Sequence, residues 1–385
     1  MVMMANRGSV LSRAAWAVLI FDIALAPGLR ATKAGLAPAG QSHTVRLSAA
    51  WFFADHFANT WFAGFLGRHK AVVESEASGP SLLDLRRAVL RSGELAAPPG
   101  AQVRFGARAA LSQDQRYFAA NAIMRDTGGA CTCIWAVSSH RFLRRIAYSG
   151  RVYNPLALSP HGSLLARPSG RGGVEIFGVR NGGRVRLLQL PRRIPQGQPI
   201  FALSFLSRSR CAAAIGSWVV CWNIGTGGVA FATRVGPKLQ AFSLLSLKRG
   251  TNLAVGCAPM TILILKAADG RIRRRLTLET SDEHLQLRHA MQGLRWAEPW
   301  SLAACANGRI LVASETSVNF HAGRGMQYVG RFVAVNIHSG AVVARSAPVL
   351  GAVYGVAVSH HGKRVLTTGT LGVRLWAVKP PLRGP

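Results

Sequence analysis

The chain has 385 residues, of which 49% are hydrophobic, so it can bury a large core and wholesale disorder is excluded. Lys and Arg number 47 against 15 acidic residues, and the formal net charge of +32 is far more than solubility requires. This excess predicts a partner that is a nucleic acid, an anionic membrane surface or an acidic protein.

An apolar run, AAWAVLIFDIALAPGL, occupies residues 14–29 and follows Arg7 and Arg13. The run is short for a membrane span and carries Asp22 at its middle. Residues 1–42 are therefore predicted to be an N-terminal extension, either an organellar targeting segment or a docking helix, with a secretory signal as the lower-ranked alternative. The expected location is intracellular, in the cytoplasm or an organelle such as the mitochondrion. Membrane contact is expected only through residues 14–29.

From residue 43 onward the chain repeats one phrase, in which short alternating strands are separated by turns rich in Gly. Seven copies follow one another at intervals of roughly 40–50 residues, the spacing of four-stranded propeller blades. The first three strands of each copy are expected at residues 61–65, 71–75 and 81–86; 109–112, 116–122 and 131–137; 156–159, 163–168 and 174–179; 201–205, 210–215 and 218–224; 242–247, 252–257 and 261–266; 301–306, 310–314 and 331–337; and 354–359, 364–370 and 373–378.

A fourth strand is expected behind six of the copies, at residues 94–97, 141–147, 184–190, 229–234, 271–278 and 341–346. The seventh copy has none, and residues 43–48 are predicted to fill that place and close the ring. The predicted fold is therefore all-β: a closed seven-bladed β-propeller of four-stranded antiparallel blades over residues 43–380, followed by a tail at 381–385.

Turn and tryptophan motifs within the copies resemble those of the WD40-repeat family. The motifs are Asp55-His56 ahead of the first copy, Ser159-Pro160-His161-Gly162 and Ser359-His360-His361-Gly362 at turns, and Trp135-Ala136, Trp222-Asn223 and Trp376-Ala377 at the ends of third strands. The chain thus resembles a divergent WD40 protein, and the resemblance implies a platform that binds other proteins. No copy has an intact Trp-Asp pair, so the family's His–Ser/Thr–Asp–Trp hydrogen-bond network is expected to be mostly absent. Quinoprotein-like and other seven-bladed propellers are the alternative relatives.

Side-chain patterns for catalysis are sparse in this sequence. Glycosidases need two carboxylates at a fixed separation, and the acidic residues of this sequence form no convincing pair. The acidic cluster Glu279, Asp282 and Glu283 is interpreted as a solvated loop. The sequence contains no G-x-S-x-G, H-E-x-x-H or P-loop motif. The chain is therefore predicted not to be an enzyme and to use no cofactor.

The six cysteines are scattered, at positions 131, 133, 211, 221, 257 and 305, which predicts reduced, buried thiols. Cys131 and Cys133 should share one face of a strand, and a core pair is favoured over a metal site. Cys211 and Cys221 flank a turn and could lie near each other. The pair His360-His361 is interpreted as a solvated turn. No metal site is predicted.

Basic residues concentrate on the predicted fourth strands and just beyond, and between Thr127 and Lys266 the only acid is Glu175. Because the fourth strand is the outer edge of a blade, these arginines are expected to form a basic rim. The rim is interpreted either as protection against edge-to-edge aggregation or as a surface for an anionic partner. The candidate residues are Arg141, Arg144, Arg145, Arg184, Arg186, Arg192, Arg193, Arg271, Arg273, Arg274 and Arg275.

A twelve-residue insertion at 319–330, NFHAGRGMQYVG, interrupts the sixth copy and offers a candidate contact loop with His321, Arg324 and Tyr328. Two functions are compatible with all these features. The first is a non-catalytic protein-interaction scaffold, with other proteins of a multi-subunit assembly as partners. The alternative is a structural RNA-associated subunit of a ribonucleoprotein, such as an organellar ribosome, that binds phosphate backbone through the arginine rim.

Overall fold

The computed structural model describes residues 46–53, 59–75, 79–87, 89–92, 94–95, 103–124, 127–148, 154–170, 172–247, 250–278, 297–305, 308–321 and 325–379. The predicted N-terminal extension and C-terminal tail lie outside these residues. No helix among the described residues is long and apolar enough to cross a membrane.

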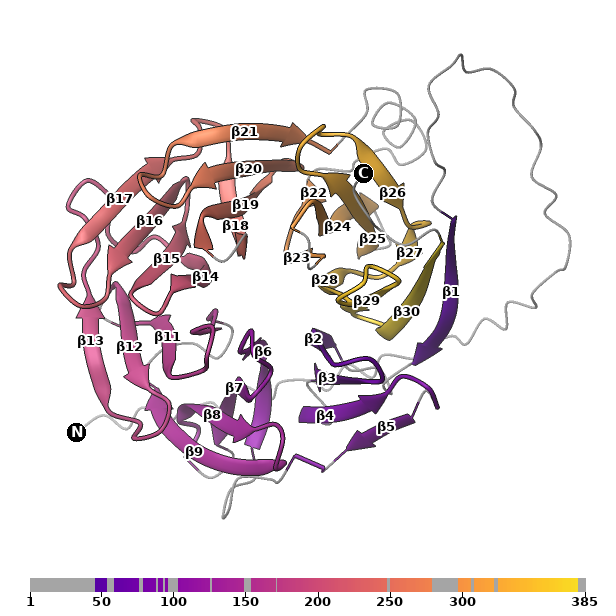
Figure 1. The fold of residues 1–385 in the computed structure, drawn as a ribbon, viewed down its shortest axis with the longest axis horizontal. Helices are drawn as coiled ribbons and strands as arrows, with labels where there is room; N and C mark the ends of the chain where they lie inside the picture. Colours follow the sequence, from indigo (N-terminus) through magenta and orange to yellow (C-terminus); the bar gives the residue numbers. More distant parts are fainter. Residues whose placement is uncertain are drawn as a thin grey trace, which may run out of the picture. The chain divides into compact units, whose positions relative to one another are not determined.

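The described strands form seven antiparallel sheets arranged as the blades of a ring, which confirms the predicted seven-bladed propeller (Figure 1). Blade 1 comprises β2 (Thr60–Leu66), β3 (Lys70–Ser75), β4 (Gly79–Asp84) and β5 (Val89–Ser92). Blade 2 comprises β6 (Val103–Leu111), β7 (Tyr117–Met124), β8 (Ala130–Ala136) and β9 (Arg141–Tyr148). Blade 3 comprises β10 (Ala157–Leu158), β11 (Leu164–Pro168), β12 (Val174–Gly178) and β13 (Arg184–Leu188).

The other four blades complete the ring in chain order. Blade 4 comprises β14 (Ile200–Ser207), β15 (Arg210–Ile215), β16 (Trp218–Asn223) and β17 (Val229–Arg234). Blade 5 comprises β18 (Gln240–Leu247), β19 (Asn252–Ala258), β20 (Thr261–Lys266) and β21 (Ile272–Thr277). Blade 6 comprises β22 (Ala297–Glu298), β23 (Leu302–Ala304), β24 (Ile310–His321), β25 (Gly325–Asn336), β26 (Val342–Arg345) and β27 (Val349–Leu350). Blade 7 comprises β28 (Val353–Val358), β29 (Arg364–Gly369), β30 (Gly372–Lys379) and β1 (Arg46–Phe53).

The ring is closed by a strand from the N-terminal side of the chain. β1 pairs antiparallel with β30, from Arg46 opposite Lys379 to Phe53 opposite Val373, and so supplies the outermost strand of blade 7. The innermost strands β2 and β28 also contact each other. The predicted closure is confirmed, but the strand covers Arg46–Phe53 and not residues 43–48. It extends further because its pairing follows β30 along nearly its whole length.

Two other predicted elements differ in the structure. The outer strand of blade 1 is Val89–Ser92, while Glu94, predicted to begin it, lies in the following bend with its carboxylate 2.9 Å from the Arg91 guanidinium. In blade 6 the supposed insertion extends the second and third strands. The ladder between β24 and β25 runs without interruption from Ile310 opposite Asn336 to His321 opposite Gly325. The insertion is thus a hairpin arm continuous with the blade.

The repeat is visible in the turns between the first and second strands of blades 2, 3 and 7. In each turn a serine hydroxyl accepts a hydrogen bond from the backbone N–H five residues later, which holds the hairpin closed. These bonds join Tyr117 N to Ser112 Oγ (3.0 Å), Leu164 N to Ser159 Oγ (2.9 Å) and Arg364 N to Ser359 Oγ (3.0 Å). The fourth turn residue has a positive φ, as at Gly162 (64°) and Gly362 (65°), where glycine carries no steric penalty.

The core lies between adjacent blades, because each sheet buries both faces against its neighbours. The third-strand tryptophans belong to this core: Trp135 and Trp222 are fully buried, and the Trp222 indole donates to the Gln189 carbonyl at 2.8 Å. In blade 7 the Trp376 indole donates to the Thr367 hydroxyl on the neighbouring strand at 3.0 Å. That bond is the Trp–Thr part of the network expected in a WD40 blade.

Candidate functional site

Eight of the rim arginines predicted from the sequence lie on the outermost strands β9, β13 and β21, at the periphery of the ring (Figure 1). Arg271 immediately precedes β21, and the remaining two are Arg192 and Arg193. Those two follow β13, in the connection to blade 4. Several of the eleven have partners. Arg184 lies 3.2 Å from the Glu175 carboxylate and Arg271 lies 3.8 Å from that of Asp269. Arg141, Arg192 and Arg275 are exposed and make no hydrogen bond or ion pair with other described residues.

Three of the rim arginines join neighbouring blades at equivalent positions. Each stands opposite a third-strand isoleucine, immediately beside a register shift in the ladder. Each guanidinium donates to a backbone carbonyl at the outer turn of the next blade. The bonds run from Arg144 to the Arg180 carbonyl, from Arg186 to that of Thr226 (3.3 Å) and from Arg274 to that of Ile337 (2.9 Å). We call Arg144, Arg186 and Arg274 the blade clasps.

The clasps give part of the basic rim a structural role. Arg193 ties the connection between blades 3 and 4 to the outer strand of blade 4, because it donates to the Ala232 carbonyl at 2.9 Å while its guanidinium lies over the Trp218 ring. In blade 4 the position equivalent to a clasp holds Phe231, which packs beneath Gly270 in the outer turn of blade 5. The sequence marked these arginines as a surface feature, but their long side chains reach sideways to the next blade.

We expect alanine at each clasp to lower the free energy of unfolding by about 1 kcal/mol, because a charge-assisted hydrogen bond and the packing of the arginine stem are lost. Alanine at Arg141 or Arg192 should change it by less than about 0.5 kcal/mol. Chemical denaturation of the purified variants measures both. Equal losses at the two sets of positions would show that the clasps do not join the blades.

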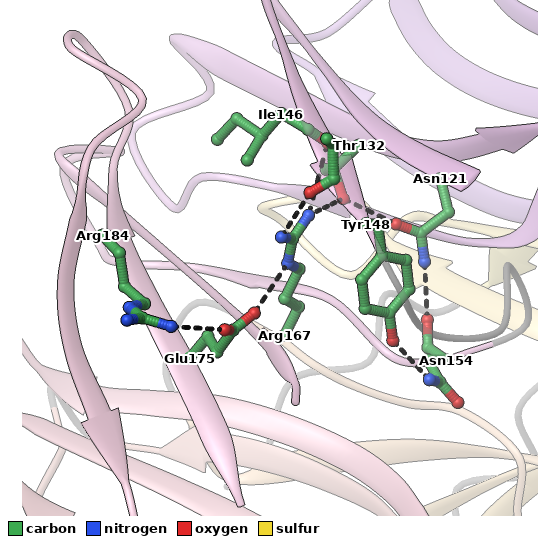
Figure 2. A network of polar contacts seen from close by, with 9 residues as sticks. Asn121, Thr132, Ile146, Tyr148, Asn154, Arg167, Glu175 and Arg184 are labelled. Atoms are coloured by element: carbon green, nitrogen blue, oxygen red, sulfur yellow. Dashed lines mark hydrogen bonds and ion pairs between the residues drawn. The ribbon is translucent and has the colours of Figure 1, made fainter. Parts of the chain in front are cut away.

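A buried arginine connects blades 2 and 3 through the polar network in Figure 2. Arg167, on β11, is 3% exposed and its Nε lies 3.5 Å from the Glu175 carboxylate. Its guanidinium donates to the Ala147 carbonyl at 2.6 Å and is enclosed by the Tyr148 and Phe177 rings, 4.5 and 4.3 Å from their centroids. Burial lowers the pKa of Arg167, and Glu175 opposes that effect.

The network continues into blade 2 as a chain of neutral side chains (Figure 2). The Thr132 hydroxyl donates to the Asn121 amide oxygen at 2.9 Å, and the Asn121 amide nitrogen donates to the Asn154 carbonyl at 2.9 Å. The Asn154 amide nitrogen in turn contacts the Tyr148 hydroxyl. The Thr132–Asn121 bond lies within blade 2, and Asn154 ties the connection between blades 2 and 3 to blade 2. Arg167 then joins blade 3 to this chain through the Ala147 carbonyl, so we assign the whole network to holding these two blades together.

A cavity of about 190 Å³ lies on the axis of the ring. All seven blades line it with residues near the beginning of their innermost strands, and aromatic rings cover most of one side. Phe201, Trp300, Tyr354 and Trp61, from blades 4, 6, 7 and 1, line this side. Phe242 of blade 5 packs between Phe201 and Trp300, and successive ring centroids from Phe201 through Phe242 to Trp61 are 4.9, 5.8, 6.2 and 4.1 Å apart. We call this cavity the axial pocket.

Arg108 of β6 points into the axial pocket from blade 2. Its guanidinium lies 5.5 Å from the centre of the Trp300 ring in blade 6, so the side chain reaches across the axis. Burial lowers the pKa of Arg108 to about 10. Arg108 is not among the residues predicted from the sequence, although an arginine beside the small apolar residues of an inner strand is itself a signal.

The candidate contact loop is only partly described. His321 closes the β24–β25 arm at its far end, and Arg324 lies outside the described residues. Tyr328 is described: its carbonyl accepts a hydrogen bond from Gly351 N at 2.8 Å, which ties the arm to blade 7. Burial, with a smaller contribution from Tyr328, raises the pKa of Tyr354 to about 12.

The six cysteines are free and buried, as predicted. The Sγ atoms of Cys131 and Cys133 are 3.9 Å apart within the core between blades 1 and 2. Cys211 and Cys221 do not meet: they point to opposite faces of blade 4, the first into the core shared with blade 3 and the second into that shared with blade 5. Among the described residues, no group of three His, Cys, Asp or Glu side chains is arranged to hold a metal ion.

The closed ring of seven antiparallel blades, six of them four-stranded, and the serine-anchored turns define a seven-bladed β-propeller of WD40-like architecture. The solved β-propeller domain of Myceliophteria thermophila Cps50 (Swd1) is similar to it, with a TM-score of 0.63 and 12% sequence identity. The match covers 87% of this chain and 100% of that one, and at this identity it shows a shared fold. No family model and no curated protein matches the sequence.

Proposed function

We propose that the chain is a non-catalytic scaffold that binds an acidic protein partner through its outer rim, within a larger assembly. By outer rim we mean the outermost strands of blades 1 to 5, which are β5, β9, β13, β17 and β21. A ring fastened by clasps and by the buried Arg167 network supplies a rigid support for such a surface.

The observation that carries this proposal is the mixture of residues on the rim. The exposed large aliphatic side chains of the described residues are Val89, Leu143, Val185, Val229, Ile272 and Leu371, and the first five of these lie on the rim strands. Val185 is 51% exposed between Arg184 and Arg186, and Ile272 is 42% exposed between Arg271 and Arg273. Protein interfaces combine apolar side chains with arginine.

This mixture favours a protein over RNA as the partner of the rim. A surface that binds phosphate backbone needs cations and gains little from exposed aliphatic side chains. An acidic partner protein can pair carboxylates with Arg141 and Arg275 while its apolar side chains cover Leu143, Val185 and Ile272. RNA association is therefore the alternative that the experiment must distinguish.

The test is affinity purification of the tagged full chain, divided into samples with and without RNase, followed by mass spectrometry. We expect protein partners to survive RNase. Replacing Leu143 and Val185 by serine should reduce their recovery about tenfold, as should Arg141→Glu with Arg275→Glu. Arg208→Glu with Arg210→Glu would break the Arg210 bond to Ala267, so the control is the single reversal Arg208→Glu in the turn after β14, compared with Arg141→Glu alone; Arg208→Glu should have no effect. Loss of all partners on RNase treatment, with no response to the serine variants, would refute the proposal.

A further inference from the structure

Arg108 places a positive charge in the axial pocket without an anion beside it. Desolvation is the cause that shifts its pKa, and no carboxylate of a described residue offsets it. Its contact across the axis is the face of Trp300, a cation–π arrangement that only partly replaces water. Arg108 is half-buried, and a cation that is partly removed from water normally has a paired anion, because desolvating a charge is costly.

The rest of the wall of the axial pocket includes aromatic rings and serine hydroxyls that are bonded to backbone groups. Trp61 stacks on Tyr354 with centroids 4.1 Å apart, and Trp300 stands edge-on to Tyr354. The two serine hydroxyls on this wall are engaged by the backbone: Ser243 donates to the Pro299 carbonyl at 2.6 Å, and Ser301 accepts from Val356 N at 3.2 Å. The guanidinium of Arg108 is thus the polar group of the described wall that still lacks a counter-charge.

We propose that the axial pocket receives the carboxylate side chain of an acidic residue presented by a partner protein. The guanidinium of Arg108 would form paired hydrogen bonds to the carboxylate oxygens, and the aromatic rings would enclose the aliphatic stem. This inference rests on the proposed scaffold function and adds a second contact point to it. It also gives the acidic character of the partner a specific site.

The single charge of Arg108 and the small volume of the pocket favour a carboxylate side chain over a phosphate or a whole small molecule. One guanidinium balances one carboxylate, whereas a phosphate dianion needs more than a single cation. The volume of about 190 Å³ is below the roughly 300–1,000 Å³ typical of sites for whole small molecules, and it suits one side chain. The β24–β25 arm extends beyond the end of the ring at which the inner strands begin, since β24 leaves the ladder with β23 in that direction. An arm at this end can guide a partner segment toward the axis.

The test uses the full chain with its tryptophans labelled with ¹⁵N, titrated with N-acetyl-glutamate N-methylamide and followed by NMR. We expect the indole N–H signals of Trp61 and Trp300 to shift in a saturable way, with a dissociation constant on the order of 1 mM for so small a probe. The glutamine counterpart should bind at least tenfold more weakly. Glutarate tests a free small acid as the source and should bind more weakly than the capped residue.

Variants at Arg108 separate binding from folding. Arg108→Gln should abolish the shifts, Arg108→Lys should restore part of them, and Arg208→Gln should leave them intact. Arg108→Gln should also melt at the same temperature or higher, because it removes a desolvated charge. No saturable shift with the glutamate probe would overturn the inference, as would tighter binding of glutarate.

The scaffold proposal and this inference fail in different ways. If partner proteins are recovered equally with wild type and Arg108→Gln, the axial pocket is not a contact point, while the rim proposal stands. If wild type recovers no RNase-resistant partner, the scaffold proposal fails, and the titration still reports on the pocket. Loss of partners with Arg108→Gln, together with the probe shifts, supports both.

Discussion

Replacing Arg167 by methionine should lower the free energy of unfolding by about 3 kcal/mol. The side chain is 3% exposed, and its removal leaves Glu175 without its buried partner and the Ala147 carbonyl without its donor. Glu175 keeps Arg184 at 3.2 Å, which holds the loss at the lower end of the range for broken buried pairs. Urea denaturation measures the change.

The control for Arg167 is a double-mutant cycle with Glu175. Glu175→Gln in the Arg167→Met background should recover about 1 kcal/mol, because the partly buried carboxylate, left with only the exposed Arg184 as a partner, no longer carries a charge. Arg167→Lys keeps the charge but not the planar stack between Tyr148 and Phe177, so it should remain destabilised. Additive effects of the two substitutions would show that Arg167 and Glu175 do not interact.

Replacing Trp222 by alanine should lower the free energy of unfolding by about 3–5 kcal/mol, the range for deleting a fully buried large aromatic side chain. Trp222 lies in the core shared by blades 3 and 4, and its indole N–H crosses to the Gln189 carbonyl after β13. Its loss therefore removes both packing and a hydrogen bond between blades. Guanidinium denaturation with fluorescence detection measures the change.

Two other substitutions serve as controls for the loss in the free energy of unfolding that is expected for Trp222→Ala. Trp222→Phe keeps most of the packing but removes the donor, so a loss of about 1–2 kcal/mol is expected. Trp218→Ala, at the half-buried beginning of the same strand, should cost less than Trp222→Ala. A larger loss at Trp218 would mean that the core between these blades is not organised around Trp222.

Strict alternation between turns made several strands predictable to the residue. Residues 210–215, 229–234 and 261–266 are β15, β17 and β20. The prediction was less accurate where alternation was weak or continued past the expected end. The outer strand of blade 1 was placed too late in the chain, and the β24–β25 arm was taken for an inserted loop.

The direction in which side chains point explains why the positions of the cysteines and the contacts of the rim arginines could not be predicted from the sequence. Cys211 and Cys221 flank one turn, but their register places them on opposite faces of the sheet. The clasp Arg274 reaches Ile337, sixty-three positions away in the chain. No local pattern encodes a contact over that separation.

The sequence by itself determined the all-β class, the number of blades, the closing strand from the N-terminal side and the basic character of the rim. These follow from periodicity, turn residues and composition, which are local properties of the chain. Only the tertiary structure decided which arginines are clasps, how Arg167 is paired, and that Arg108 meets the Trp300 ring across the axis. Those arrangements depend on residues from separate blades converging, and closure of the ring is what brings them within contact distance.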